Sequence, residues 1–136
     1  MILKDDASKY SEIFKNATHA TAGIAPASGI IPVPATKEGL VVIGDAAGMC
    51  NPVTGAGIYN AVYSAYIAAE KISLSNEKND RSILSEIKDS YNDSFSKSIG
   101  RAVKKREYML DNWQGSSVSF DEMIRKSWIA FRDYWK

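Results

Sequence analysis

Apolar residues recur every four positions through the second half of the chain. The stripe comprises Ile83, Ile87, Tyr91, Phe95, Ile99 and Val103, with Leu84 and Ala102 beside it. Because an α-helix repeats every 3.6 residues, this spacing predicts a long helix whose buried stripe drifts slowly round its axis. Asn79 or Asp80 is the expected N-cap, and the run from Trp113 to Ser117 is expected to end the helix.

A second helical signal lies near the end of the sequence. Ser119 and Glu122 have the Ser-x-x-Glu spacing of a capping box, which predicts a last helix that runs to about Trp135. Residues 75–136 are therefore expected to form a C-terminal helical region.

The first half mixes extended segments with helices. A short helix is predicted over residues 7–16 and a β-capable stretch over residues 17–24. Two prolines restrict residues 30–34 to extended backbone. Residues 40–43, Leu-Val-Val-Ile, have no polar alternation, which predicts a strand buried on both faces.

A further helix is predicted from Ile58 to about Ile72, followed by a polar linker over residues 73–80. Its apolar positions include several small side chains, as expected for close packing against a sheet or a ligand: Ile58, Ala61, Val62, Ala65, Ala68, Ala69 and Ile72. The expected fold class is α+β, with one region over residues 1–74 and the helical region over residues 75–136.

Composition excludes several functional classes. The 136 residues carry a net charge of +1, from 17 basic and 16 acidic side chains, so no nucleic-acid partner is expected. The single cysteine, Cys50, rules out an internal disulfide and a multi-cysteine metal site, and no metal site is predicted. No apolar run approaches the roughly 20 residues that span a bilayer. A cytoplasmic protein is expected, with peripheral membrane contact left open.

The glycine-rich loop between residues 43 and 58 carries the candidate chemistry. Asp45 directly follows the predicted strand, where a carboxylate can accept hydrogen bonds from ligand hydroxyls or cap backbone amides. Gly55 and Gly57 let the backbone approach a ligand closely. The first N–H groups of the following helix would favour a phosphate or the carbonyl edge of a flavin. A plain strand-turn-helix connection with an aspartate cap is the alternative, because glycine-rich turns alone are weak signals.

The extended pattern resembles the second flavin motif of the geranylgeranyl reductase family. This family belongs to the para-hydroxybenzoate-hydroxylase-like group of FAD-dependent oxidoreductases. The matching residues are Gly44-Asp45-Ala46-Ala47-Gly48, Asn51-Pro52-Val53-Thr54-Gly55-Ala56-Gly57-Ile58 and Asn60-Ala61. The resemblance covers roughly residues 17–110.

The resemblance implies that the cofactor is FAD and that the chain is a fragment of an FAD-binding α/β fold. Residues 1–74 would be the C-terminal part of the FAD-binding domain, and Asp45 would hydrogen-bond the ribityl chain. The implied cofactor-binding residues are Gly44, Asp45, Pro52, Gly55, Ala56, Gly57 and Ile58. The catalytic residues remain unassigned.

The function implied is that of a C-terminal segment of a reductase that transfers hydride from flavin to C=C bonds of an isoprenoid lipid. The sequence contains no G-x-G-x-x-G for the ADP half of FAD, so an N-terminal FAD-binding part is expected to be missing and activity of this chain alone is not expected. The alternatives are a hydroxylase, halogenase or electron-transfer flavoprotein of the same fold, or a cofactor-free, non-catalytic module. Homo-oligomerisation stays open.

Overall fold

A computed structural model describes residues 25–113 and 117–136. The helix predicted over residues 7–16 and the β-capable stretch over residues 17–24 lie outside the described residues. The elements in chain order are η1 (Gly44–Ala47), α2 (Ile58–Lys78), η2 (Arg81–Glu86), α3 (Ile87–Asn112), α4 (Phe120–Ser127) and η3 (Arg132–Trp135), where η marks a 3-10 helix.

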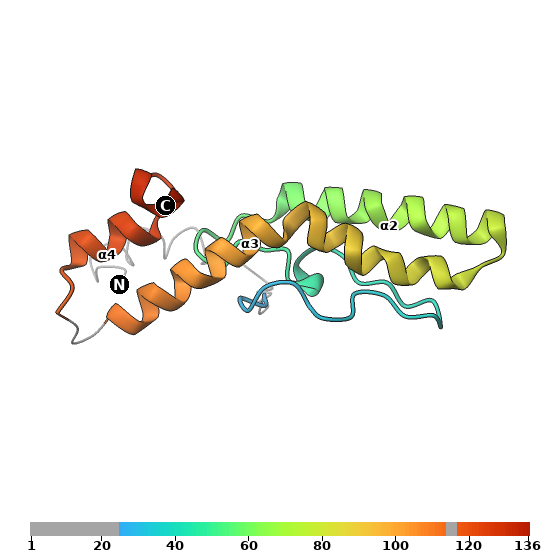
Figure 1. Cartoon of the computed structure of the whole chain (residues 1–136), viewed down its shortest axis with the longest axis horizontal. Coiled ribbons are helices and arrows are strands. Elements are labelled where there is room, and N and C mark those ends of the chain that lie inside the picture. The colour runs from blue at the N-terminus through green and yellow to red at the C-terminus, as the bar shows by residue number, and fades with distance from the viewer. Residues whose placement is uncertain (1–24, 114–116) are drawn as a thin grey trace, which may run out of the picture.

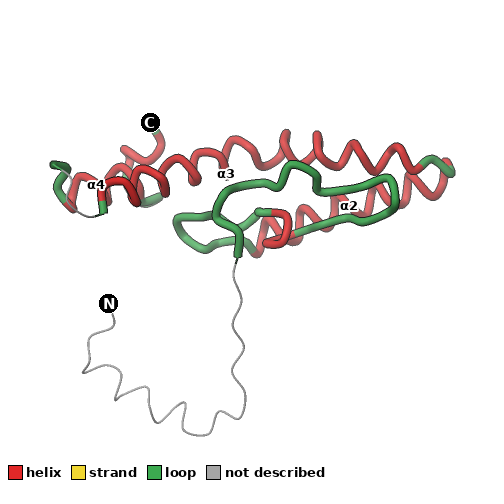
Figure 2. The backbone as a smooth tube through the Cα atoms, turned by 90° about the horizontal axis from the view of Figure 1, so that it is seen from below, coloured by secondary structure: helices red, strands yellow, loops and turns green. Residues whose placement is uncertain are grey.

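Two long helices form the frame of the molecule. Figure 1 shows α2 and α3 side by side and antiparallel, joined at one end by the turn into η2. The loop segment from residue 25 to residue 57 runs along this hairpin, and α3 continues beyond α2 to the part that carries α4 (Figures 1 and 2). The glycine loop is thereby held against the start of α2, near the middle of α3.

The apolar stripe of α3 is the core of the molecule, as the four-residue spacing predicted. The buried residues of this core are Ala47, Met49, Ile67, Leu84, Ile87, Tyr91, Phe95 and Ile99. The Asp80 side chain accepts a hydrogen bond from the Ser82 N–H at 2.9 Å, which confirms one of the two predicted caps. The first turns after this cap are 3-10 rather than α-helical.

The buried face of α2 differs from the predicted one. Its buried residues are Ser64, Ile67, Ala68 and Ser75, whereas Ile58 and Val62 are 86% and 67% exposed. The helix also continues through the predicted linker to Lys78. Of the predicted apolar positions only Ala68 is buried, whereas the buried Ser64 and Ser75 are polar and carry no apolar signal in the sequence.

The strand predicted over residues 40–43 is not formed, and the described residues contain helices and loops with no strand. Ala35 and Val41 make a single antiparallel bridge, and Leu40 and Ile43 are 62% and 43% exposed rather than buried. A strand needs donors on a neighbour, and the adjoining segment contains Pro32 and Pro34, which have none. The β part of the expected α+β fold is therefore not seen here.

The last helix begins as predicted and ends early. Ser119 Oγ accepts a hydrogen bond from the Glu122 N–H at 3.2 Å, so Ser119 is the N-cap of α4. The helix stops at Ser127, and residues 132–135 form the 3-10 turn η3 instead of a continuation. Met123 and Tyr134 are buried, because α4 packs against the far end of α3 and η3 packs against α4. No helix of the described part is long and apolar enough to cross a membrane.

Candidate functional site

The glycine loop begins with a backbone anchor at Gly44. This residue has a φ of 58°, and its N–H donates to Ser64 Oγ on α2 at 3.0 Å. A Cβ at this position would come 3.2 Å from the Ala61 Cβ, so the loop backbone lies directly against α2. Gly44 is buried. It therefore positions the loop against α2.

Tyr91 completes this anchor from the α3 side. Its buried hydroxyl lies 3.1 Å from the Ser64 carbonyl oxygen and 3.2 Å from that of Val42, and can donate to either. Burial raises the pKa of this hydroxyl, which keeps it protonated as a donor. Sequence reasoning placed Tyr91 in the core stripe and assigned no role to Ser64. A polar residue on the packed face of a helix is the signal that could have identified Ser64.

A second close approach fixes the end of η1. Gly48 has a φ of 76°, and its N–H donates to the Asp45 carbonyl at 2.9 Å. A Cβ on Gly48 would stand 2.0 Å from the Gly29 carbonyl oxygen. Position 48 therefore requires glycine both for its backbone angle and for the space that residue 29 occupies.

Asn51 closes the turn that carries Pro52 and Gly55. Its Oδ1 accepts hydrogen bonds from the Val53 and Thr54 N–H groups at 3.0 and 3.1 Å. Its backbone N–H donates to the Ala56 carbonyl, and its carbonyl accepts from the Gly55 N–H, both at 2.8 Å. An asparagine side chain that mimics a backbone turn in this way is common before proline. The matched motif includes Asn51, but the sequence alone did not reveal this role.

The Asp45 side chain lies against Gly57. A Cβ built on Gly57 would be 2.7 Å from Asp45 Oδ1 and 3.4 Å from the Cys50 Cα. Gly57 has a φ of −146°, outside the left-handed range that favours glycine, so the missing side chain matters here for the space that it leaves. Asp45 itself is exposed. Its carboxylate thus stands at the surface, next to the residue that starts α2.

The N-terminus of α2 opens onto a surface pocket. The N-cap residue is Gly57, which has no side chain to satisfy the first N–H groups of the helix. The pocket has a volume of about 360 Å³. It is lined by Asn51, Thr54, Ala56, Gly57, Ile58, Tyr59, Asn60, Ser98 and Ile129. Partial positive charge at a helix start therefore faces a partly apolar hollow.

The predicted site residues fall into three groups. Ala56, Gly57 and Ile58 line the pocket, and Asp45 lies beside Gly57. Pro52 and Gly55 form the Asn51 turn, with open space around the Cα of Gly55. Gly44 is buried in the anchor. Ser98 and Ile129 were missed as lining residues because they come from distant parts of the sequence.

Cys50 is a buried thiol in this loop. Burial first, and then the Asp45 carboxylate, raise the pKa of Cys50 above its ordinary value. A raised pKa disfavours the nucleophilic thiolate. Among the described residues, no group of three or more histidine, cysteine, aspartate or glutamate side chains could hold a metal ion.

The loop fits one part of a flavin cofactor. Gly57 has no Cβ between Asp45 and the pocket, and the start of α2 offers N–H groups toward it. A pocket of about 360 Å³ is at the small end of the range for ligand sites, which suits a ring system rather than a whole dinucleotide. The residues present thus fit the isoalloxazine and ribityl parts of FAD.

Comparison with known proteins identifies the family. The family model described as squalene epoxidase matches residues 7–99, more than half of the chain. The chain belongs to the squalene epoxidase family. This family is a class of FAD-dependent oxidoreductases.

Curated proteins similar to this squalene epoxidase family member are named digeranylgeranylglycerophospholipid reductase. The protein of Methanocaldococcus jannaschii is 48% identical over 58 residues, 43% of this chain and 15% of the relative. That of Thermoplasma acidophilum is 42% identical over 52 residues, 38% of this chain and 13% of the relative. That of Methanosphaerula palustris is 53% identical over 34 residues, 25% of this chain and 8% of the relative. These matches confirm the resemblance to geranylgeranyl reductases.

A solved structure has the same fold. It is a geranylgeranyl bacteriochlorophyll reductase-like protein from Thermoplasma acidophilum, with a TM-score of 0.60 and 19% sequence identity. The match covers 93% of this chain and 38% of that protein. This squalene epoxidase family member therefore spans well under half the length of the solved relative.

Proposed function

We propose that this chain supplies the ribityl and isoalloxazine side of an FAD site in a reductase of isoprenoid lipids. The observation that carries the proposal is the contact of Asp45 with Gly57 at the uncapped start of α2. A carboxylate, a side-chain-free approach and a helix N-terminus are brought together over a pocket. Ligand hydroxyls can donate hydrogen bonds to the carboxylate, and the helix N-terminus favours an electron-rich carbonyl edge.

In this arrangement the residues have separate tasks. Asp45 accepts hydrogen bonds from ribityl hydroxyls, and the N–H groups at the start of α2 stabilise negative charge at the carbonyl edge of the ring. Gly55 and Gly57 keep the approach open. FAD, when bound, supplies the hydride chemistry, while the protein positions the ring and provides the electrostatic environment.

The proposed substrate class is an isoprenoid lipid with isolated C=C bonds. The names of the curated relatives contain digeranylgeranylglycerophospholipid, and we extend that class to this chain.

The ADP half of FAD would bind to a further FAD-binding part, on the N-terminal side in this family. The exposed apolar residues Ile58, Val62 and Tyr66 on the outer face of α2 support contact with additional polypeptide. In a complete reductase, such a contact would bring the second part of the FAD site to the glycine loop.

Flavin titration of the purified chain tests this proposal. Riboflavin, FMN and FAD are titrated in turn, and binding is followed by quenching of flavin fluorescence. Because only the ring and ribityl side would be held, the three dissociation constants should agree to within a few-fold. Asp45→Ala should weaken all three equally, while Asp93→Ala on α3 serves as the control for loss of one exposed carboxylate.

Two outcomes would contradict the proposal. Absence of binding for all three flavins would remove the cofactor site from this chain. Much tighter binding of FAD than of riboflavin would show that the ADP half is recognised here. For the substrate, the chain is coexpressed with an FAD-binding part of a relative and incubated with a geranylgeranyl lipid and dithionite, which reduces the bound FAD. A mass gain of two hydrogens per reduced bond is the expected product signature.

A further inference from the structure

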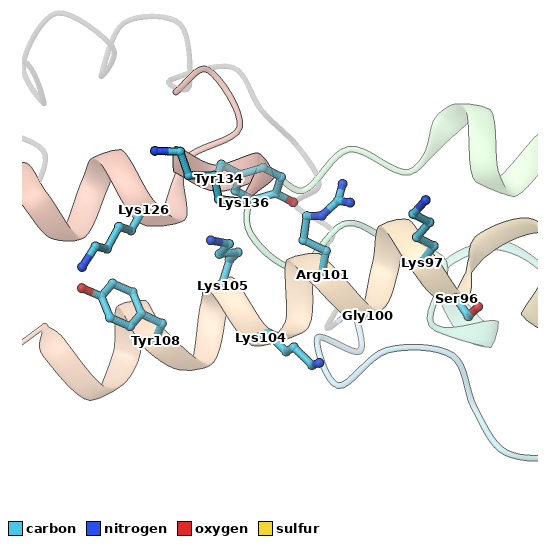
Figure 3. Close-up of a pocket in the computed structure, with 10 residues that line it drawn as sticks. All are labelled: Ser96, Lys97, Gly100, Arg101, Lys104, Lys105, Tyr108, Lys126, Tyr134 and Lys136. Carbon is cyan, nitrogen blue, oxygen red and sulfur yellow. The ribbon is translucent and has the colours of Figure 1, made fainter. Parts of the chain in front are cut away.

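A basic groove lies at the opposite end of α3 from the η2 turn. It has a volume of about 580 Å³ and is lined from α3, α4, η3 and the last residue, Lys136. Figure 3 shows its ten lining residues: Ser96, Lys97, Gly100, Arg101, Lys104, Lys105, Tyr108, Lys126, Tyr134 and Lys136. Six of the ten side chains are basic and none is acidic, in a chain whose net charge is only +1.

The spacing of the cations concentrates charge on one side of α3. Lys97, Arg101 and Lys105 are each four residues apart, and Figure 3 shows their side chains on the same side of the helix. Like charges at this spacing repel and destabilise a helix. A bound anion would relieve this repulsion, which makes the arrangement unfavourable without a ligand and favourable with one.

The charges of these three residues are not neutralised within residues 25–113 and 117–136. There the ion pairs at the groove join Lys126 to Glu122 and Lys136 to Asp133, and none joins Lys97, Arg101 or Lys105 to a carboxylate. Lys105 Nζ donates to the Asp133 backbone carbonyl at 3.2 Å. This neutral partner holds Lys105 in place but leaves its charge available to an anion.

Aromatic rings orient two of the cations. The Arg101 guanidinium lies 5.1 Å from the centre of the Trp135 ring, and Lys105 Nζ lies 5.7 Å from that of Tyr134. A guanidinium stacked on a ring keeps N–H groups at its edge, where they can bind two oxygens of one phosphate. The groove thus has a preorganised donor as well as charge.

We propose that this groove binds the phosphate of an anionic lipid headgroup. The Arg101 guanidinium lies over Trp135, which is 54% exposed, and Trp128, directly after α4, is 40% exposed. Exposed tryptophans next to basic residues are typical of a surface that meets the headgroup region of a membrane. A soluble phosphate ester would be recognised by the same cations but would gain nothing from these apolar neighbours.

Vesicle binding of the full chain tests the proposal, with no flavin needed. Cosedimentation is measured with phosphatidylglycerol vesicles and with phosphatidylcholine vesicles. The groove variant carries Lys97→Gln, Arg101→Gln and Lys105→Gln. The matched control carries Lys37→Gln, Lys78→Gln and Lys88→Gln, which removes three exposed charges that do not line the groove. Circular dichroism melting checks that both variants fold.

The groove variant should lose on the order of 100-fold in partitioning to phosphatidylglycerol, because each basic side chain near an anionic surface contributes about fivefold. The control should stay within a few-fold of the unmodified chain, and phosphatidylcholine should bind weakly in every case. Equal losses in both variants would overturn the proposal, since they would indicate unspecific attraction. Titration with inorganic phosphate supplies the second arm. Groove-dependent phosphate binding without vesicle binding would overturn the lipid assignment in favour of a soluble phosphate ester.

The groove and the flavin proposal can fail separately. The groove shares no lining residue with the pocket at the glycine loop. Loss of vesicle binding in the groove variant with unchanged riboflavin affinity is the expected combination.

Discussion

The Asp45 carboxylate stands where a side chain at Gly57 would have to be: a Cβ on Gly57 would come 2.7 Å from Asp45 Oδ1. Neither residue alone makes the site. The aspartate can take this position because Gly57, the N-cap residue of α2, has no side chain.

Gly57→Ala should therefore lower flavin affinity without unfolding the protein. The new methyl group displaces the Asp45 carboxylate, which is cheap for a flexible side chain, so the free energy of unfolding should change by less than about 1 kcal/mol. Loss of a charged hydrogen bond to the ribityl chain should weaken riboflavin binding by roughly tenfold or more. Gly100→Ala is the control, because a Cβ there meets nothing within 4 Å. Unchanged affinity in Gly57→Ala would separate Asp45 from the flavin site.

Gly48→Ala should be strongly destabilising, by about 3 kcal/mol or more. The substitution combines a left-handed backbone angle with a Cβ placed 2.0 Å from the Gly29 carbonyl oxygen. Gly39→Ala is the matched control: its φ is also positive, at 101°, but its Cβ would meet only the Arg81 side chain at 3.9 Å. Urea denaturation of both variants isolates the cost of the clash. Equal losses would mean that the loop moves away from residue 29 without penalty.

Tyr91→Phe should destabilise the chain by about 1–2 kcal/mol. The variant keeps the ring in the core but removes the hydroxyl that can donate a hydrogen bond to the Val42 or Ser64 carbonyl. Tyr66→Phe removes a hydroxyl that bonds the exposed Glu70, and it should change the free energy of unfolding by less than about 0.5 kcal/mol. The measurement is urea denaturation. A similar small effect in both variants would contradict the anchoring role of Tyr91.

The Cys50 thiol should react slowly in the native protein. Because burial and Asp45 raise the pKa of Cys50, the native reaction with iodoacetamide should reach half its maximal rate at a higher pH than in urea-unfolded chain. Because the pKa of Cys50 is higher in the native protein, its protonated thiol contributes to the free energy of unfolding at pH values below the pKa of the unfolded chain. That contribution is lost as pH rises through the native value. A native midpoint at or below the unfolded one would show an activated thiol instead.

The helical half of the fold could be predicted because its signal is local and long. The stripe from Ile83 to Ile99 repeats over several turns, and only one side of α3 can be buried by such a pattern. The caps at Asp80 and Ser119 depend on residues two or three positions away. The prediction for α2 was right at Ala68 but missed Ser64 and Ser75, because a buried serine carries no apolar signal.

The strand over residues 40–43 could not be judged from its own residues. Its apolar run is compatible with a strand, but a strand exists only where a neighbouring backbone offers hydrogen bonds. In the described residues that neighbour contributes one bridge, at Ala35, beside two prolines. Ser98 and Ile129 could not be predicted as pocket residues for the same reason. Each comes near the glycine loop only because another element packs there.

The sequence by itself determined the helical stripe, the caps, the glycine loop and the resemblance that gives the loop its meaning, because each depends on residues close together in the chain. Tertiary structure decided which face of α2 is buried, that Asp45 meets Gly57, and that Lys97, Arg101 and Lys105 share a groove with Tyr134 and Lys136. Those relationships depend on how helices pack, and packing is set by the volumes and charges of side chains that are distant in sequence.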